Sequence, residues 1–402
     1  MNAVTFSSIG NVDVTMVPLP QLEANSRDAL VRVRSAGLCG SDLHPYLGKE
    51  VVDIGTIFGH EMVGIVESVS DSIDSYLVGK RVLCPFSTCC GEEDCVQCKC
   101  GLSARCPKGQ LLGFRSDQKG LHGCQAEFVR VPLARGTLVP IPDDVTDEEG
   151  LLIGDIFSTA VFCATNAGLA SYTHSSSPLS TAAQVLSGNS VHLRQAPVVV
   201  VVGCGPVGLC TIAASIELLT TQKEKEQEEQ RKQGVNVETT SMSSSIRVFA
   251  LDSVSGRLAA AQRLGAIPLS SDIFLEQIKK ETNGVGADVV LECVGAPSAL
   301  ESAFNMIRPG GVISSVGVHT SSTWPFTLGQ AYDKNITFRT GRCPARSMVP
   351  YSLEIIKRIK ERGINLVNEI ISHRVPLSNA PDAYKRFSNR EDGYRKIVFI
   401  IT

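Results

Sequence analysis

A short cysteine-rich stretch, CPFSTCCGEEDCVQCKCGLSARC, runs from Cys84 to Cys106 and holds half of the fourteen cysteines of the chain. Thiolates at such turn-sized spacings can converge on one metal ion, and zinc takes four of them in a tetrahedron. Four sulfur ligands leave no open position for a substrate. The stretch therefore predicts a structural zinc site, whose expected ligands are Cys90, Cys95, Cys98 and Cys106.

The first ligand of this site stays open, because Cys89 and Cys90 are adjacent and either one fits the spacing. Cys100 is a spare thiol in the same stretch. An iron–sulfur cluster is the alternative metal group that four cysteines can hold. The ligand types elsewhere in the chain favour zinc.

A second group of metal-binding residue types lies in AGLCGSDLH and GHEMVG. A catalytic zinc needs about three protein ligands and an open position for water or substrate. Cys39 and His60 supply two of them. Asp155, in LLIGDIFSTA, is the best candidate for the third, although aspartate also serves well as the N-cap of a following helix. Such a site would lower the pKa of a water molecule or hydroxyl group bound at the open position.

A glycine-rich turn, GCGPVG, follows five consecutive valines and precedes the helical stretch LCTIAAS. A dinucleotide-binding fingerprint requires this strand–turn–helix context, since the glycines let backbone N–H groups approach a pyrophosphate. The residues expected to contact the cofactor there are Gly203, Gly205, Val207 and Gly208. Asp252 ends the next predicted strand, where a carboxylate binds ribose hydroxyls and repels a 2′-phosphate. NAD is therefore favoured over NADP.

These residues lie on two patterns of secondary structure. Over residues 1–156, short β-type runs such as ALVRVRSAG alternate with glycine turns, which predicts an antiparallel, β-rich domain. Over residues 157–341, apolar strands alternate with helical stretches, which predicts a parallel, doubly wound sheet of the α/β class. Polar stretches near 171–195 and 220–245 are expected to be solvated insertions, the second a helix extension ending in a loop. The second also explains why Asp252 stands more than about 20 residues beyond the turn.

Length and composition exclude several classes of function. The 402 residues exceed what one hydrophobic core usually serves, so two or three domains are expected. The net charge is −3 and the basic residues are scattered, which favours a small-molecule partner over nucleic acid or a membrane surface. The N-terminus does not have the pattern of a signal peptide, so the chain is expected to stay in the cytoplasm. In that reducing compartment, fourteen cysteines indicate metal binding or catalysis rather than disulfides.

Five motifs together are highly specific: GLCGSDLH, GHEMVGIVESV, the cysteine stretch, GCGPVG and ECVGAPSALESAFNMIRPGGVISSVGV. Over nearly its whole length, the two insertions excepted, the chain resembles the zinc-dependent medium-chain alcohol dehydrogenases. The resemblance implies a GroES-like catalytic domain and a Rossmann domain, with residues 342–402 returning to the catalytic domain. It also implies two zinc ions per chain, NAD as cofactor, and hydride transfer from a primary or secondary alcohol to give an aldehyde or ketone.

The resemblance further assigns roles around the catalytic zinc, whose ligands would include Cys39 and His60. Ser41 would take the proton from the alcohol, and His44 would pass it toward solvent. Asp42 would hydrogen-bond His60 and fix its tautomer. Glu61 would act on the metal mainly through its charge, with occasional ligation.

On the cofactor, the resemblance implies four contacts outside the glycine turn. Arg257 would lie on the adenosine side, and Val294 would line the adenine side. Val318 would meet the nicotinamide carboxamide, and Arg395 would reach the pyrophosphate. A homodimer or homotetramer is expected.

The sequence also departs from the family pattern. Many members have a cysteine where Asp155 stands, and an aspartate there is similar to the branch that includes glutathione-independent formaldehyde dehydrogenases. Four residues separate Cys90 from Cys95, where the family usually has two. The substrate stays open among simple alcohols, polyols, amino alcohols such as threonine, and formaldehyde.

Two other functions are possible on the same scaffold: a zinc-free quinone or enoyl reductase, and a binding protein without catalysis. Both are expected to lack Cys39, Ser41 or His60, and all three residues are present. The sequence therefore favours a zinc oxidoreductase.

Overall fold

The computed structural model describes residues 1–24, 26–171, 197–234, 246–391 and 393–401. The chain divides into two compact units. The first unit comprises Met1–Thr159, Arg342–Ile356 and Val367–Thr402, and the second comprises Ala160–Gly341 and Lys357–Leu366. The expected insertion near 171–195 falls almost wholly outside the described residues, as do residues 235–245 of the second expected insertion.

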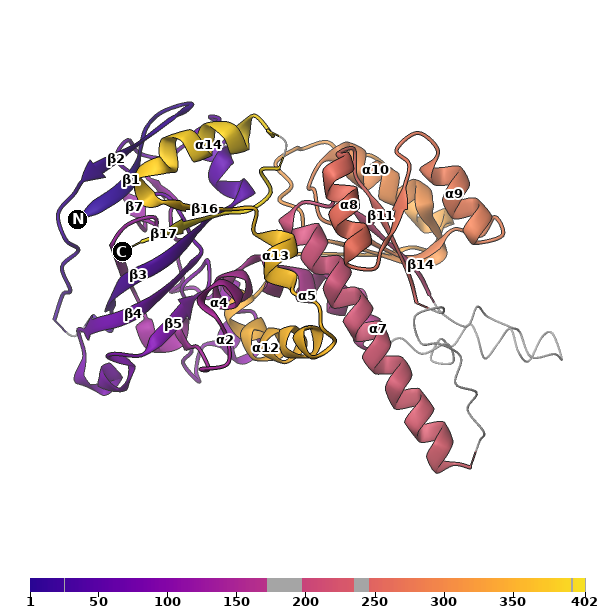
Figure 1. The fold of residues 1–402 in the computed structure, drawn as a ribbon, viewed down its shortest axis with the longest axis horizontal. Helices are drawn as coiled ribbons and strands as arrows, with labels where there is room; N and C mark the ends of the chain where they lie inside the picture. Colours follow the sequence, from indigo (N-terminus) through magenta and orange to yellow (C-terminus); the bar gives the residue numbers. More distant parts are fainter. Residues whose placement is uncertain (25, 172–196, 235–245, 392, 402) are drawn as a thin grey trace. The chain divides into compact units, whose positions relative to one another are not determined.

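The first unit is built on a seven-stranded sheet in which every neighbouring pair except β16 and β17 is antiparallel (Figure 1). The strands lie in the order β16-β17-β3-β4-β5-β9, and β8 also pairs with β3. Their bounds are β3 (Ala29–Leu38), β4 (Met62–Val69), β5 (Arg81–Cys84), β8 (Phe128–Val131), β9 (Val139–Pro140), β16 (His373–Pro376) and β17 (Ile397–Ile400). Val31 and Val33 of β3 are buried and Arg32 between them is exposed, as period-two patterning requires.

Short elements surround this sheet. Two hairpins are formed by β1 (Asn2–Ser8) with β2 (Asn11–Met16) and by β6 (Arg115–Ser116) with β7 (Lys119–Gly120). The helices are η1 (Gly40–Asp42), α1 (Leu43–Tyr46), η2 (Ser72–Leu77), α2 (Val96–Lys99), η3 (Ser103–Arg105), α3 (Ala134–Thr137), α4 (Asp147–Gly154), η6 (Leu377–Asn379) and α14 (Ala380–Ser388). Helices α5 (Ile156–Asn166), α12 (Ala345–Glu361) and α13 (Leu366–Ile370) contribute residues to both units.

The register of three adjacent strands brings distant residues to one edge of the sheet. Leu38, the last residue of β3, pairs with Ile397 of β17, and Ala36 of β3 pairs with Met62 of β4. The residues just outside these strands are Cys39, Lys396 and Glu61, respectively. They are therefore neighbours at this edge, although they are far apart in the sequence.

The second unit contains a six-stranded parallel sheet in the order β12-β11-β10-β13-β14-β15 (Figure 1). The strands are β10 (Val198–Val202), β11 (Arg247–Leu251), β12 (Ile267–Leu269), β13 (Ala287–Glu292), β14 (Ile307–Ser315) and β15 (Thr337–Thr340). The helices are η4 (Leu169–Ser171), α7 (Pro206–Lys232), α8 (Ser255–Arg263), α9 (Phe274–Glu281), α10 (Pro297–Met306) and α11 (Leu328–Asp333). All five valines of β10 are buried, as in a parallel strand covered on both faces.

The path through this sheet confirms the predicted doubly wound α/β class. The chain leaves the central strand β10 for β11 and β12, then returns to the other side of β10 for β13, β14 and β15. The topological switch point therefore lies between β10 and β13. Open sheets of this kind bind ligands at the carboxyl ends of the strands beside that point.

The charged run KEKEQEEQRK continues helix α7 as far as Lys232, and this long helix is the pink one in Figure 1. Glu228 and Lys232 form an i,i+4 ion pair at 2.8 Å on its last turns. Arg362 contacts Glu217 and Glu224 of α7, which explains why residues 357–366 belong to the second unit. Every helix among the described residues is too short or too polar to cross a lipid bilayer.

Gly208 shows how tightly α7 packs on the glycine turn. A Cβ atom at this position would lie 1.7 Å from the carbonyl oxygen of Gly203. Gly208→Ala should therefore destabilise the protein by about 1–3 kcal/mol, the usual cost of overpacking. Thermal or urea unfolding of the purified protein would measure the change.

Gly329→Ala is the matched control, because Gly329 lies in the exposed first turn of α11 and its Cβ would touch nothing closer than 3.7 Å. This change should leave stability unchanged or raise it slightly, since alanine favours a helix over glycine. Equal stability of the two variants would contradict the close approach of α7 to the turn.

Candidate metal and nucleotide sites

Four residues of the first unit form a buried cluster at the edge defined by β3 and β4. Cys39 follows β3, and His60 and Glu61 precede β4. Asp155 lies between helices α4 and α5. One ligand atom from each of the four lies within 4.8 Å of the others, so the structure brings together every residue predicted for the catalytic metal.

Asp155 directs one carboxylate oxygen to the cluster and the other to the next helix. Its Oδ2 lies 3.3 Å from Nε2 of His60 and 3.9 Å from Sγ of Cys39. Its Oδ1 accepts a hydrogen bond of 3.4 Å from the hydroxyl of Thr159 in α5. A capping box between Thr146 and Glu149 starts helix α4, which ends where Asp155 begins. The Asp155 side chain thus contacts the cluster through Oδ2 and hydrogen-bonds the first turn of α5 through Oδ1.

Ser41 lies beside the same atoms. Its hydroxyl donates to Sγ of Cys39 at 3.3 Å and lies 3.2 Å from Nε2 of His60. A hydroxyl in this place can exchange a proton with a molecule bound at the cluster. His44 makes no hydrogen bond to Ser41 among the described residues, and its Nδ1 instead lies 3.4 Å from Oε1 of Glu50.

The other ring nitrogen of His60 faces Asp42. Nδ1 lies 3.1 Å from Oδ1 of Asp42, although the alignment falls short of a hydrogen bond. Asp42 is itself fixed, because its Oδ2 accepts the backbone N–H of Cys39 at 2.9 Å and the amide of Gln125 at 3.4 Å. Such support orients a histidine ligand and sets its tautomer.

Glu61 has a partner that the sequence analysis missed. Lys396, only 1% exposed, donates to Oε2 of Glu61 and, at 3.2 Å, to the carbonyl oxygen of Leu38. The other oxygen, Oε1, has no hydrogen-bond partner among the residues that the structure describes. A Cβ atom on Gly37 would lie 1.8 Å from Oε2, so glycine leaves the room that this ion pair needs. The only signal in the sequence is a lysine at the start of an apolar strand, Lys396-IVFI.

Burial and neighbouring charges together set the electrostatics of the cluster. It raises the pKa of the Cys39 thiol, and the charge of Glu61 adds to this effect. Burial lowers the pKa of His60, but Asp42 and Asp155 outweigh it and hold that pKa well above its usual value. Burial also raises the pKa of Glu61 to about 7, against the opposing charge of Lys396. Acidic groups crowded in this way favour a cation among them.

The donor set fits zinc. Thiolate sulfur, imidazole nitrogen and carboxylate oxygen are the ligand types of catalytic zinc sites. With metal–ligand distances of about 2.0–2.3 Å, the ligand atoms of a tetrahedron lie about 3.3–3.8 Å apart. The separations of Asp155 Oδ2 from His60 Nε2 and Cys39 Sγ, 3.3 and 3.9 Å, are close to that range.

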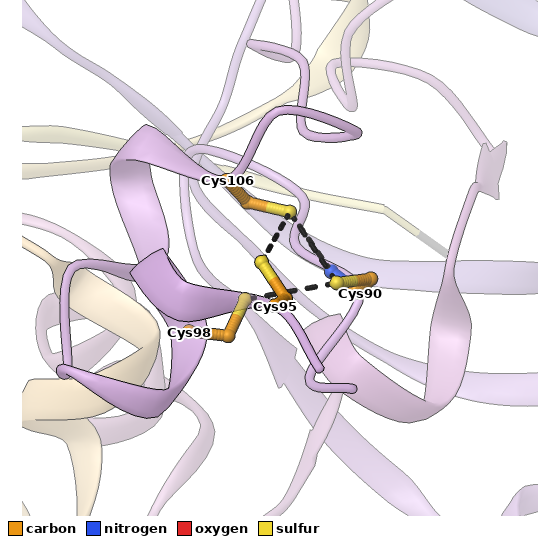
Figure 2. Close-up of side chains that lie close together, drawn as sticks. All are labelled: Cys90, Cys95, Cys98 and Cys106. Carbon is orange, nitrogen blue, oxygen red and sulfur yellow. Dashed lines mark hydrogen bonds between the residues drawn. The ribbon is translucent and has the colours of Figure 1, made fainter. Parts of the chain in front are cut away.

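Four cysteines of the first unit form the second group, shown in Figure 2. Cys95 and Cys98 lie at helix α2, and Cys90 and Cys106 lie in the loops on either side. Sulfur–sulfur distances are 3.5 Å for Cys90–Cys106, 3.8 Å for Cys90–Cys98 and 4.0 Å for Cys95–Cys106. These values are close to the edge of about 3.8 Å expected for sulfurs around a tetrahedral zinc.

The neighbouring cysteines are not members of this set of four, although Cys89 packs against Cys90 and Cys106. The Cys89 thiol donates to the carbonyl oxygen of Gly136 at 3.2 Å, and its backbone N–H donates to the hydroxyl of Thr137. Cys100 is exposed. The four residues between Cys90 and Cys95 form a loop that still returns both sulfurs to one point (Figure 2).

The glycine turn of the second unit connects β10 to α7. Gly203 has φ +88°, a conformation that favours glycine, and Val294 packs where a side chain on Gly203 would stand. Gly205 is the N-cap of α7, and Val207 lies in its first turn. The N-terminus of this long helix offers backbone N–H groups and a positive dipole to a phosphate.

Asp252 follows β11 and is hydrogen-bonded to the glycine turn between β10 and α7. Its Oδ2 accepts the backbone N–H of Cys204 at 2.7 Å, and its Oδ1 accepts that of Val254 at 2.8 Å. Arg257 Nη1 lies 3.7 Å from Oδ2, so the predicted acidic and basic residues are neighbours.

The remaining predicted cofactor residues lie in two places. Val294 and Val318 belong to loops after β13 and β14 and are about half exposed, at 49% and 52%. Arg395 belongs to the first unit and precedes Lys396. Its backbone N–H donates to the hydroxyl of Ser372 at 3.0 Å.

Comparison with known proteins supports the interpretation of both units. Residues 25–143 match the family model of the alcohol dehydrogenase GroES-like domain, and residues 242–371 match that of the zinc-binding dehydrogenases. The chain is 36% identical to zinc-type alcohol dehydrogenase B of Aspergillus flavus, over 99% of this chain and 81% of that protein. It is 37% identical to a medium chain reductase/dehydrogenase of an Acremonium species, over 83% of this chain and 98% of that protein.

A solved structure extends the likeness to the fold. The alcohol dehydrogenase TADH from Thermus sp. ATN1 matches with a TM-score of 0.79 and 32% sequence identity, covering 100% of both chains. The motifs, the two folded units and these relatives agree, and the chain belongs to the zinc-type, medium-chain alcohol dehydrogenase family of oxidoreductases.

Proposed function

We propose that the chain oxidises a primary or secondary alcohol to an aldehyde or ketone, with NAD as hydride acceptor and two zinc ions per chain. The observation that carries this proposal is the buried cluster of Cys39, His60, Glu61 and Asp155, with Ser41 within 3.3 Å of two of its atoms. A set of sulfur, nitrogen and oxygen ligands beside a hydroxyl suits proton removal from an alcohol better than it suits a purely structural metal.

Each residue has a separate task in this proposal. Cys39, His60 and Asp155 hold the zinc, which when bound supplies the positive charge that makes an alcohol hydroxyl acidic. Ser41 takes up the proton of the substrate, and Asp42 keeps His60 oriented. His44 would carry the proton outward only through a bound molecule that bridges it to Ser41, because the two side chains are not hydrogen-bonded to each other. Glu50, whose side chain is 39% exposed, lies 3.4 Å from Nδ1 of His44.

Glu61 is kept next to the zinc ligands by Lys396. The ion pair leaves Oε1 without a partner at the cluster. In this proposal the residue would lower the positive potential around the metal and would serve as an occasional ligand.

The second zinc is held by Cys90, Cys95, Cys98 and Cys106. Its closed set of four sulfurs leaves no position for a substrate, so its task is to hold the loop from Cys90 to Cys106 in shape. All fourteen cysteines are free of disulfides, which suits a reducing compartment, and we propose that the protein acts in the cytoplasm. A homodimer or homotetramer is the assembly that the family resemblance implies.

Removing a catalytic ligand should separate turnover from folding. Cys39→Ala should lower kcat at least about a thousandfold, because the loss of several kcal/mol of charge stabilisation corresponds to that factor. The zinc content should fall from about two ions per chain to about one. Steady-state kinetics with NAD and a panel of alcohols, including polyols and threonine, together with metal analysis, would test both.

Cys100→Ala is the matched control, since this thiol is exposed and lies outside both groups. It should keep both zinc ions and full activity. Full activity of Cys39→Ala would show that the motif has been misinterpreted, and no reduction of NAD by the unmodified enzyme with any alcohol of the panel would refute the proposed reaction.

Loss of the sulfur site should act on stability instead. Cys98→Ala removes one of four ligands, and a structural zinc contributes directly to folding free energy. The variant should melt at a lower temperature and lose about one zinc per chain. Differential scanning calorimetry and metal analysis would show this, and a variant that lost zinc but kept the parent melting temperature and activity would count against a structural role.

Cofactor choice should depend on the charge of Asp252. Its carboxylate lies at the end of β11, where a 2′-phosphate would be repelled. Asp252→Asn should reduce the preference for NAD over NADP by at least about tenfold in kcat/KM, or about 1.4 kcal/mol. Asp272→Asn, an exposed change in the same unit, is the control and should leave the preference unchanged. A parent enzyme that preferred NADP would overturn the assignment.

A further inference from the structure

Three polar side chains form a hydrogen-bonded chain at the carboxyl ends of β13 and β14. Glu292, the last residue of β13, is fully buried, and Ser315, the last residue of β14, is fully buried beside it. The Ser315 hydroxyl donates to Oε2 of Glu292 at 2.6 Å. His319, four residues further on, places Nε2 2.7 Å from the same hydroxyl and 3.6 Å from Oε2 of Glu292.

The direction of these bonds fixes where the protons are. A hydroxyl has one proton to donate, and that of Ser315 goes to the carboxylate. Nε2 of His319 must therefore carry a proton and donate it to the Ser315 oxygen. Ser315 is thus neither exposed nor paired with a base, which excludes a nucleophile of the serine–histidine–acid type.

The chain of bonds joins two loops. Oε1 of Glu292 accepts the backbone N–H groups of Val294 and Gly295, each at 2.7 Å, and so anchors the loop of residues 293–296. His319 anchors the loop of residues 316–320 through Ser315. The loops touch along their backbones, because a Cβ on Gly317 would lie 2.0 Å from the nitrogen of Gly295.

These loops stand on one side of the switch point. Val294 of the first loop packs against Gly203 of the glycine turn. In doubly wound sheets the two halves bind the two nucleosides of a dinucleotide, and the half with the acidic residue, here Asp252 after β11, takes the adenosine ribose. The loops after β13 and β14 belong to the other half, which leaves them for the nicotinamide nucleoside. Val294 would then lie on the nicotinamide side, not on the adenine side that the family resemblance implied.

We propose that His319 is a positioning residue for the nicotinamide half of the cofactor. It acts through Ser315 and Glu292, which hold residues 293–296 and 316–320 in the arrangement that this half of the ligand meets. The inference rests on the proposed function, since it requires a nicotinamide dinucleotide to bind. It adds a specific expectation: loss of His319 should weaken the binding of the nicotinamide half of the cofactor more than the binding of the adenosine half.

Two ligands separate the halves of the site. NADH contains both nucleosides, whereas ADP-ribose keeps the adenosine, both phosphates and the second ribose but lacks the nicotinamide ring. Titration calorimetry on the full-length, zinc-loaded protein would give the Kd of each. His319→Ala should raise the Kd of NADH about tenfold, which corresponds to about 1.4 kcal/mol, and should change that of ADP-ribose less than about twofold. Ser315→Ala should have the same selective effect.

Two further variants test the interpretation. His319→Gln retains an N–H donor and should restore most of the NADH affinity. Thr323→Ala, an exposed change just outside the loop of residues 316–320, should leave both Kd values unchanged. Equal weakening of both ligands by His319→Ala would mean a general loosening of the unit and would overturn the inference, as would unchanged binding of NADH. If the unmodified protein binds neither ligand, the proposed function fails together with the inference.

Discussion

The structure of the first unit depends on a concentration of acidic groups in one buried place. A thiol and two carboxylates, from Cys39, Glu61 and Asp155, lie with His60 inside a sphere only a few ångströms wide. Burial without a counter-charge would be costly for each of them. Lys396 supplies one positive charge from within the chain. The ligand types that remain are those of a divalent metal, and the surrounding hydrogen bonds, such as those of Asp42, are arranged to orient ligands.

The order of the strands in the sheet is what brings the members of this cluster together. The strand β17 comes last in the chain, yet it pairs with β3 and brings Lys396 beside Leu38. Glu61 and Lys396 are 335 residues apart in sequence. The charge balance of the cluster is therefore complete only when the C-terminal strand has joined the sheet, so the site is a property of the finished fold.

The sequence could predict those parts of the site whose information is local. Cys39 and Ser41 share one short motif, and GCGPVG lies directly between a strand and a helix, so spacing and context identify them. The cysteines at positions 95, 98 and 106 could be grouped for the same reason, whereas spacing left the first ligand open between Cys89 and Cys90. The parallel sheet was predictable because five buried valines have no polar face. Lys396 and His319 could not be found this way, since their partners are set by strand register and by loop contacts, which local patterns do not encode.

Each half of the parallel sheet has a carboxylate that binds the backbone N–H groups of a neighbouring loop. Asp252 after β11 and Glu292 at the end of β13 each accept two backbone N–H groups, at 2.7–2.8 Å for Asp252 and at 2.7 Å for Glu292. A carboxylate is a strong acceptor for such groups, and both are nearly or fully buried. The two carboxylates differ in their side-chain partners. Arg257 faces Asp252, whereas the Ser315 hydroxyl and the His319 imidazole lie beside Glu292.

That difference has a consequence for the ligand. The guanidinium of Arg257 is a permanent cation and can meet an anionic or hydroxyl-rich group on the adenosine side. Around Glu292, the Ser315 hydroxyl and the His319 imidazole use their protons within the protein, one for the carboxylate and one for the hydroxyl. Their effect is therefore on the position of the loop backbone. The uncharged nicotinamide carboxamide is a group that backbone N–H and C=O can recognise, and under the proposed assignment the geometry of these loops would decide how well it is held.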